Sequence, residues 1–157
     1  MERIYFLVLG VVLGASLIVY VIYKMAPGLM MRESVSKYSF EETLEQLQQK
    51  VDAIGWKVPH IHDLQATMLK FDFEVRKVKV LEICKPDYAY MVLSRDDERI
   101  ASTLMPCRIS VYEKSDGKVY VSRLNSVGMG GVFGGIIKKA MSRAGRESEE
   151  IIGSVTL

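Results

Sequence analysis

Residues 108–124 read RISVYEKSDGKVYVSRL and predict a hairpin around which the rest of the fold can be arranged. Two strand-like segments, 108–113 and 118–124, flank a short connection that contains Asp116 and Gly117. An Asp-Gly pair between two strand-like segments is a strong signal for a tight hairpin turn. The sequence therefore predicts two neighbouring antiparallel strands in the second half of the chain.

The clearest helix signal lies upstream, at Ser39. Ser39 and Glu42 have the spacing of a capping box, in which each side chain satisfies a free backbone N–H group of the first helical turn. Five apolar residues then recur at intervals of four and three and share one helical face: Phe40, Leu44, Leu47, Val51 and Ile54. Gly55 follows them, and glycine commonly ends a helix.

The remaining elements alternate between strands and short helices. Asp63 is a candidate N-cap for a helical turn, and Pro86 suits the first turn of a helix that runs to Leu93. Further strands are expected at residues 33–38, 56–61 and 75–84. This order predicts an α+β fold with two layers, in which helices pack on one face of a single sheet.

The N-terminal region contains an uncharged run, residues 4–23, that reads IYFLVLGVVLGASLIVYVIY. A helix of this length covers about 30 Å, the thickness of the hydrocarbon core of a bilayer. We expect a tail at residues 1–3, a single transmembrane helix at 4–23 and a linker at 24–32. A cleaved signal peptide is the alternative, but its apolar core would be shorter and would end at a small-x-small site.

The orientation of this helix follows from weaker signals. Lys24, Arg32 and Lys37 after the run favour a cytoplasmic domain by the positive-inside rule. A short basic N-terminus that leads directly into an apolar run is instead typical of a signal anchor. We therefore expect a single-pass membrane protein whose soluble domain lies outside the cytoplasm, in the periplasm of a cell that has one.

Composition limits the classes of function. The chain of 157 residues has 21 Lys and Arg against 19 Asp and Glu, a net charge of +2. The basic and acidic residues are distributed along the whole chain, and this distribution argues against binding of nucleic acid. The length of the soluble part fits one globular domain. The expected partners are the lipid bilayer and either an integral membrane protein or a second copy of the chain.

Small residues spaced for close helix packing occur in two segments. They are Gly10 with Gly14 in the apolar run, and Gly130 with Gly134 and Gly131 with Gly135 near the C-terminus. The second group belongs to the sequence VGMGGVFGGII at 127–137, which is too short to span a bilayer. It could contact the membrane interface or a partner's membrane helix, or it could be a hinge before the amphipathic helix expected within 126–157.

Three segments together resemble the bacterial and archaeal domain of unknown function 302 family. They are SVSKYSFEETLEQLQQKVDAIGWKV, EICKPDYAYMVLSRDD and LMPCRISVYEKSDGKVYVSRLN, and the resemblance covers about residues 33–125. The most specific parts are the turn from Cys84 to Pro86 and the segment from Pro106 to Arg108. The resemblance implies a compact α+β fold that tends to pair into dimers, sometimes with an N-terminal anchor. It implies no particular reaction.

Cys84 and Cys107 are the only cysteines, and each lies at a predicted strand end beside a proline. Three interpretations stay open for this pair. The two side chains could be small buried hydrophobic groups, which is the usual role of free cysteine. They could form a disulfide bond, or they could be redox-active or sulfur-handling thiols, although no C-x-x-C motif supports that role.

His60 and His62 are the only histidines, and both would project from the same side of a strand. They could bind one metal ion or one haem iron if Asp63, Cys84 or Cys107 completed the ligand set. Covalent c-type haem is excluded because no C-x-x-C-H motif occurs. The alternative is a pair of polar histidines at a sheet edge or a dimer seam.

The remaining candidates for chemistry are weaker. The methionines are scattered, without a Met-x-x-Met cluster, and are interpreted as core filling and membrane-proximal contacts rather than soft-metal ligands. No G-x-S-x-G motif supports a serine hydrolase, and Glu149 and Glu150 are interpreted as solvated charges. The leading hypothesis is a non-enzymatic, membrane-anchored accessory or binding subunit with an unknown cofactor or ligand. The alternative is a redox, sulfur-handling, metal-binding or haem-binding protein.

Overall fold

The structure is a computed structural model that describes residues 2–157. Its described part contains one antiparallel sheet of five strands in the order β1-β5-β4-β3-β2. The strands are β1 (Met31–Val35), β2 (Lys57–Asp63), β3 (Val78–Cys84), β4 (Cys107–Glu113) and β5 (Val119–Leu124). The predicted α+β fold with a single sheet is therefore confirmed, and β4 and β5 are joined by the predicted turn.

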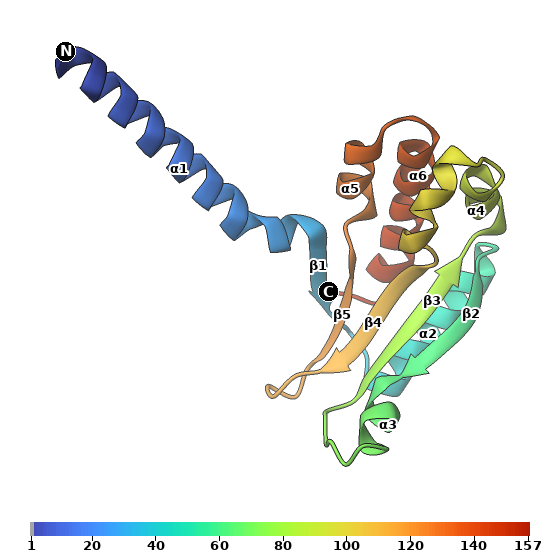
Figure 1. The fold of residues 1–157 in the computed structure, drawn as a ribbon. Helices are drawn as coiled ribbons and strands as arrows, with labels where there is room; N and C mark the ends of the chain where they lie inside the picture. The colour runs from blue at the N-terminus through green and yellow to red at the C-terminus, as the bar shows by residue number, and fades with distance from the viewer. Residues whose placement is uncertain (1) are drawn as a thin grey trace.

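Helices precede, connect and follow these strands (Figure 1). They are α1 (Glu2–Met30), α2 (Phe40–Ala53), α3 (Leu64–Leu69), α4 (Pro86–Leu93), α5 (Ser126–Phe133) and α6 (Gly135–Gly153), with a 3-10 helix, η1 (Asp97–Leu104), between α4 and β4. The capping box at Ser39 and Glu42 is present at the start of α2, and Asp63 caps α3 by accepting a hydrogen bond from the Ala66 N–H group.

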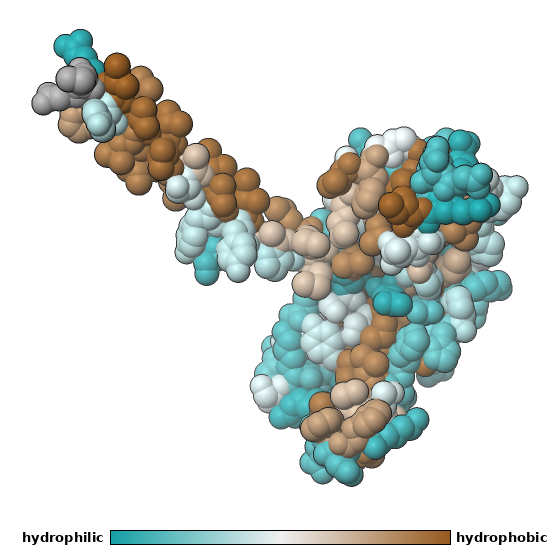
Figure 2. All heavy atoms as spheres, in the orientation of Figure 1, coloured by the Kyte–Doolittle hydropathy of each residue, from teal (hydrophilic) through white to brown (hydrophobic). Residues whose placement is uncertain are grey.

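Helix α1 extends away from the sheet and is apolar over most of its length (Figures 1 and 2). It is long and apolar enough to cross a membrane. The expected tail at residues 1–3 is not separate, because Glu2 and Arg3 already belong to α1, whereas Met1 lies outside the described residues.

The expected linker at residues 24–32 is also replaced by regular structure. Helix α1 continues through Pro27 to Met30, and β1 begins at Met31. Pro27 lies near the helix end, where it removes only one backbone hydrogen bond. Strand β1 then pairs with β5, in register from Met31 opposite Leu124, so the chain after α1 is held by the sheet.

The core lies between the sheet and helices α2 and α6. The sheet presents alternate residues to it, because successive side chains of a strand point to opposite faces. These inward residues include Leu81, Ile83, Ile109, Val111 and Val121, and the helices contribute Leu44, Leu47, Val51, Ile151 and Ile152. Helices α2 and α6 thus cover one face of the sheet, which fixes the position of α6 relative to β3 and β4.

Helices α5 and α6 form an antiparallel pair joined by Gly134 and Gly135, which have φ angles of 73° and 50°. Positive φ is easily adopted by glycine, so this sharp turn depends on residues without a side chain. The packing of the two helices also needs glycine. A Cβ atom on Gly145 would lie 2.8 Å from Val127 Cγ2, and one on Gly130 would lie 3.1 Å from Met141 Cβ.

Candidate functional site

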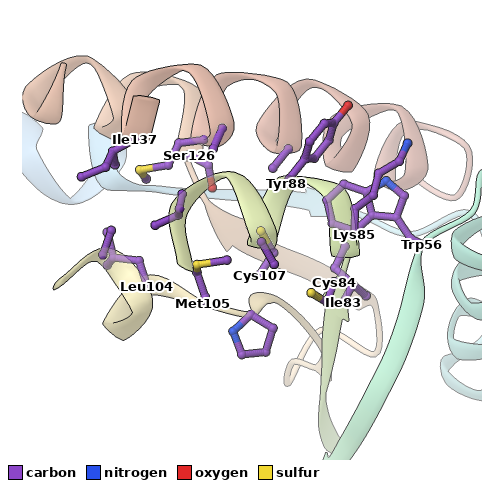
Figure 3. A pocket seen from close by; sticks show the side chains of 17 residues that line it. Trp56, Ile83, Cys84, Lys85, Tyr88, Leu104, Met105, Cys107, Ser126 and Ile137 are labelled. Atoms are coloured by element: carbon purple, nitrogen blue, oxygen red, sulfur yellow. The ribbon is translucent and has the colours of Figure 1, made fainter. Parts of the chain in front are cut away.

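A small apolar cavity lies where α4, η1 and α6 meet the ends of β3 and β4. Its volume is about 60 Å³. Residues from widely separated segments line it, among them Trp56, Cys84, Tyr88, Met105, Cys107 and Ile137 (Figure 3). A concave, apolar site with a few polar groups at one edge is the usual form of a binding site for a small ligand.

Local signals in the chain place the two cysteines in this cavity. Cys84 is the last residue of β3, and Pro86 then starts α4. Cys107 is the first residue of β4, opposite Ile83 in the register of the two neighbouring strands. The sheet therefore brings both residues to one end of the β3 and β4 pair, with Cys107 in phase with the inward-facing Ile83 and Ile109 and Cys84 in phase with Glu82.

Glu147 forms a polar cluster at the edge of the cavity. Its carboxylate accepts hydrogen bonds from Trp56 Nε1 at 2.7 Å, from Lys85 Nζ at 2.7 Å and from the Tyr88 hydroxyl. The start of α4, through Lys85 and Tyr88, and the segment before β2, through Trp56, are thus tied to α6 by one carboxylate. We call these four residues the Glu147 cluster.

The Glu147 cluster shifts the acidity of its members. Burial alone would raise the pKa of Glu147, but hydrogen bonds from Lys85, Tyr88 and Trp56 outweigh it and hold this pKa below the ordinary value of 4.5. The same hydrogen bond to Glu147 raises the pKa of Lys85 and the pKa of Tyr88. At neutral pH the cluster therefore contains an ionised Glu147 paired with a protonated Lys85.

Both thiols are free in the structure. Burial raises the pKa of Cys84. Burial, followed by the nearby Cys84, raises the pKa of Cys107 to about 11. The thiolate is the reactive nucleophile, so these shifts make both side chains weak nucleophiles at neutral pH.

We expect iodoacetamide to alkylate Cys84 and Cys107 in the native full-length chain much more slowly at pH 7 than in the same chain unfolded in denaturant. The reasons are burial and the scarcity of thiolate. Mass spectrometry after timed quenching measures the modified fraction at each cysteine. Rapid native alkylation of Cys107 at pH 7 would contradict this assignment and support activated thiols.

The two histidines lie away from the cavity. His60 and His62 belong to β2, with ring centroids 4.3 Å apart. His62 Nε2 lies 3.0 Å from Glu82 Oε1, and the same oxygen is 3.3 Å from Arg108 Nη2. Within residues 2–157, no group of three or more His, Cys, Asp or Glu side chains is arranged to hold a metal ion.

The predicted glycine surfaces occupy different environments. Gly10 and Gly14 lie on α1, where an added Cβ atom would meet nothing within 4 Å. Gly131, Gly134 and Gly135 have similarly open surroundings. Gly130, in contrast, is buried against α6, so it contributes to packing within the domain rather than to an outer surface.

The sequence patterns did not predict the Glu147 cluster. The position of Glu147 did indicate one, because it lies three residues after Ala144 and four before Ile151, on the apolar face of α6. A charged residue at such a position needs a partner. The interpretation of Glu149 as a solvated charge was also wrong, since it pairs with Arg123, with a distance of 3.1 Å from Arg123 Nε to Glu149 Oε1.

Comparison with known proteins gives a consistent result for the fold. A family model described as "Domain of unknown function DUF302" matches residues 32–154. The match thus extends beyond the predicted limit of residue 125 and includes α5 and α6. No curated protein matches the chain at a significant level.

A solved structure also resembles the chain. It is the crystal structure of an uncharacterized conserved protein of the same family description from Bacillus stearothermophilus, with a TM-score of 0.71 and 16% sequence identity. The alignment covers 80% of this chain and 97% of that chain. At this identity, the likeness shows a shared fold.

Proposed function

This chain belongs to the family described as domain of unknown function DUF302, and from that premise we propose that it is a membrane-anchored binding subunit. The family model starts at residue 32, so α1 precedes the shared domain. Helix α1 supplies the anchor in this proposal, and the domain carries the binding surfaces, on the extracytoplasmic side of the membrane.

The observation that carries the proposal is the attachment of α5 to the end of α1. The Asn125 N–H group donates to the Met30 carbonyl oxygen at 2.8 Å, and Asn125 Nδ2 donates to the Leu29 carbonyl oxygen at 2.9 Å. Figure 1 shows α5 standing beside the C-terminal end of α1. The start of α5 is therefore held close to the C-terminal end of α1, which in this proposal is the point where the anchor leaves the bilayer.

The free end of α5 has the composition of a membrane-contacting tip. Val132 and Phe133 are 85% and 46% exposed, and Lys138 and Lys139 follow in the first turns of α6. Exposed apolar side chains next to basic residues suit the boundary between acyl chains and anionic headgroups. We infer that this tip, residues 132–135, contacts the bilayer surface and orients the domain.

A tryptophan placed at the tip tests this contact. In vesicles made with brominated phospholipid, we expect Val132→Trp to show strong fluorescence quenching because bromine quenches an indole at close range. The matched control is Ser115→Trp, in the turn at the opposite end of β5. The chain has one native tryptophan, Trp56, which is 1% exposed and provides a constant background.

Two outcomes separate the alternatives for the tip. Greater quenching for Val132→Trp than for Ser115→Trp supports bilayer contact. Equal quenching of the two variants would contradict it, and the tip would then be free for a protein partner. The quenching of the unchanged chain gives the contribution of Trp56 to both measurements.

Helix α1 also offers a surface for an integral membrane partner. Gly10 and Gly14 leave open space on the helix, as close approach of a second helix requires. We propose that this surface docks on a membrane protein or on the α1 helix of a second copy. Co-purification of the full chain in mild detergent tests this docking, and a solitary monomer would count against it.

A further inference from the structure

A second cavity, of about 90 Å³, lies between α6 and the neighbouring ends of β4 and β5. Its lining is partly polar, with residues that include Arg123, Ser148 and Glu149. Residues 104–107 and Ser126 line both this cavity and the apolar cavity described above. An apolar space and a polar space therefore lie next to each other, at the segment that joins η1 to β4.

Ser148 brings an unpartnered hydroxyl group to the polar cavity. The residue is 9% exposed, and its Oγ atom has no hydrogen-bond partner within residues 2–157. Ala144 and Ile152, one helical turn before and after it, are core residues, so Ser148 lies on the face of α6 turned toward the sheet. A buried hydroxyl without a partner destabilises a fold and calls for an explanation. No hydrogen bond holds this side chain in one rotamer, so it can turn toward the cavity that it lines.

Arg123 supplies hydrogen-bond donors to the same cavity. It is in phase with Val121, a core residue of β5, so its side chain also points toward α6, and only 11% of that side chain is exposed. Its guanidinium donates to both carboxylate oxygens of Glu149 and to Ser34 Oγ, at 2.5–3.1 Å. A guanidinium has five N–H donors, so these three bonds leave two of them for another acceptor.

The charged groups around the polar cavity carry a net positive charge. Its lining contains two arginines, Arg108 and Arg123, against one carboxylate, that of Glu149. Arg32 also pairs with Glu149, and Glu82 pairs with Arg108, so including these two partners leaves the same excess of one positive charge. An anionic ligand is therefore favoured over a cationic one.

We propose that the two cavities together bind a small monocarboxylate with an apolar tail. The carboxylate lies in the polar cavity, where Arg123 and Ser148 donate hydrogen bonds to it, and the tail occupies the apolar cavity. Hydrogen bonds from a guanidinium to a carboxylate are short and strong because both partners are charged. The proposal rests on the proposed function in that it gives the binding subunit a ligand, but it uses neither α1 nor the tip.

The volumes of the cavities limit the ligand to a small molecule. They are about 60 and 90 Å³, together about 150 Å³. An apolar protein cavity of about this size holds a molecule as large as benzene, so the tail has roughly five or six carbon atoms. Met105 lines both cavities and is half-buried. Its unbranched side chain is flexible and can move aside to let the tail pass from one cavity to the other.

Isothermal titration calorimetry of the full-length protein with hexanoate, in mild detergent, tests the site. A titration of hexanoate into the same detergent without protein gives the background. We expect one hexanoate per chain. Hexylamine, which carries the opposite charge, and acetate, which lacks the tail, should each bind at least about 10-fold more weakly. No saturable heat with hexanoate, or equal affinity for hexylamine or acetate, would overturn the proposal.

Two substitutions test the two ends of the ligand. Ser148→Ala should weaken hexanoate binding about 10-fold, the loss expected for one hydrogen bond to a charged group. It should leave the unfolding midpoint unchanged or raise it, because it removes an unpaired buried hydroxyl, whereas loss of a structural contact would lower the midpoint. Ser142→Ala, at a half-buried position of α6 outside both linings, is the matched control.

Ala89→Leu fills part of the apolar cavity and should weaken binding by more than about 10-fold, the effect of excluding two or more methylene groups of the tail from burial. Its matched control is Ala53→Leu, at an exposed position near the end of α2. Unchanged affinity for hexanoate in either Ser148→Ala or Ala89→Leu would overturn the proposal.

Fluorescence of the unchanged protein gives a readout that does not depend on the folding of any variant. Trp56 is the single tryptophan and lines the apolar cavity. We expect 4-bromobenzoate to quench its fluorescence saturably, and excess hexanoate to restore it, because the bromine enters the cavity at the tail end of the ligand. Absence of saturable quenching would overturn the proposal. The bilayer contact of the tip and the docking of α1 are measured separately, so such a failure would leave the proposed membrane-anchored subunit standing.

Discussion

Trp56→Ala is expected to lower the free energy of unfolding by about 3–5 kcal/mol, the usual range for removing a large aromatic side chain from a core. Trp56 is 1% exposed, and its ring meets the Tyr88 ring edge-on, with centroids 6.2 Å apart. Its indole N–H group also donates to Glu147. The substitution therefore removes packing in the core, one wall of the cavity and one member of the Glu147 cluster.

Denaturant unfolding of the full chain in mild detergent, followed by far-ultraviolet circular dichroism, measures this loss. Trp56→Phe is the matched control, since it keeps an aromatic ring but removes the indole donor. We expect the phenylalanine variant to lose less stability than the alanine variant. A loss below about 1 kcal/mol for Trp56→Ala would show that this side chain does not support the core as described.

Glu147→Gln is expected to cost about 1–3 kcal/mol at neutral pH. The substitution removes the charged acceptor that serves Trp56, Lys85 and Tyr88, and a donor that loses its partner in a half-buried site carries a cost of this order. Glu150→Gln, at an exposed position of the same helix, is the matched control and should change the unfolding midpoint little. Equal stability of the two variants would contradict the role of the cluster.

The effect of Glu147 should also depend on pH in a defined direction. Its pKa in the folded chain lies below the ordinary value of 4.5, so its ionised form stabilises the fold. This contribution is fully present above the unfolded pKa and is lost as pH falls through the folded pKa. The stability difference between the unchanged chain and Glu147→Gln should therefore shrink below about pH 4.5. Unfolding midpoints measured across the acid range check this trend.

Local patterns predicted the elements whose signals are short in sequence. The capping box at Ser39 and the apolar spacing behind it predicted α2, because backbone satisfaction and helical periodicity depend on residues three or four apart. Asp116 and Gly117 likewise predicted the hairpin of β4 and β5. The boundaries predicted around residues 24–32 were less accurate. A linker was expected there, but β1 starts at Met31 because it pairs with β5, a contact between segments far apart in the chain.

The candidate site could be predicted only in part. The positions of Cys84 and Cys107 at strand ends followed from local signals, and so did the possibility that the sheet brings them together. His60 and His62 do share one side of β2, but the packing places no cysteine beside them to complete a ligand set. The alternation of side chains along one strand depends on neighbouring residues. Which residue could act as a third metal ligand depends on how distant segments pack together.

Composition, periodicity and contiguous motifs were enough to predict an apolar helix long enough to span a bilayer, the α+β class and the family. Tertiary packing alone puts Cys84, Met105 and Cys107 in the lining of one cavity and joins Glu147 to Trp56, Lys85 and Tyr88. These groups are far apart in the chain. They meet because α6 packs on the sheet through Ala144, Ile151 and Ile152 and contacts α4, and no local pattern specifies which side chains such packing brings together.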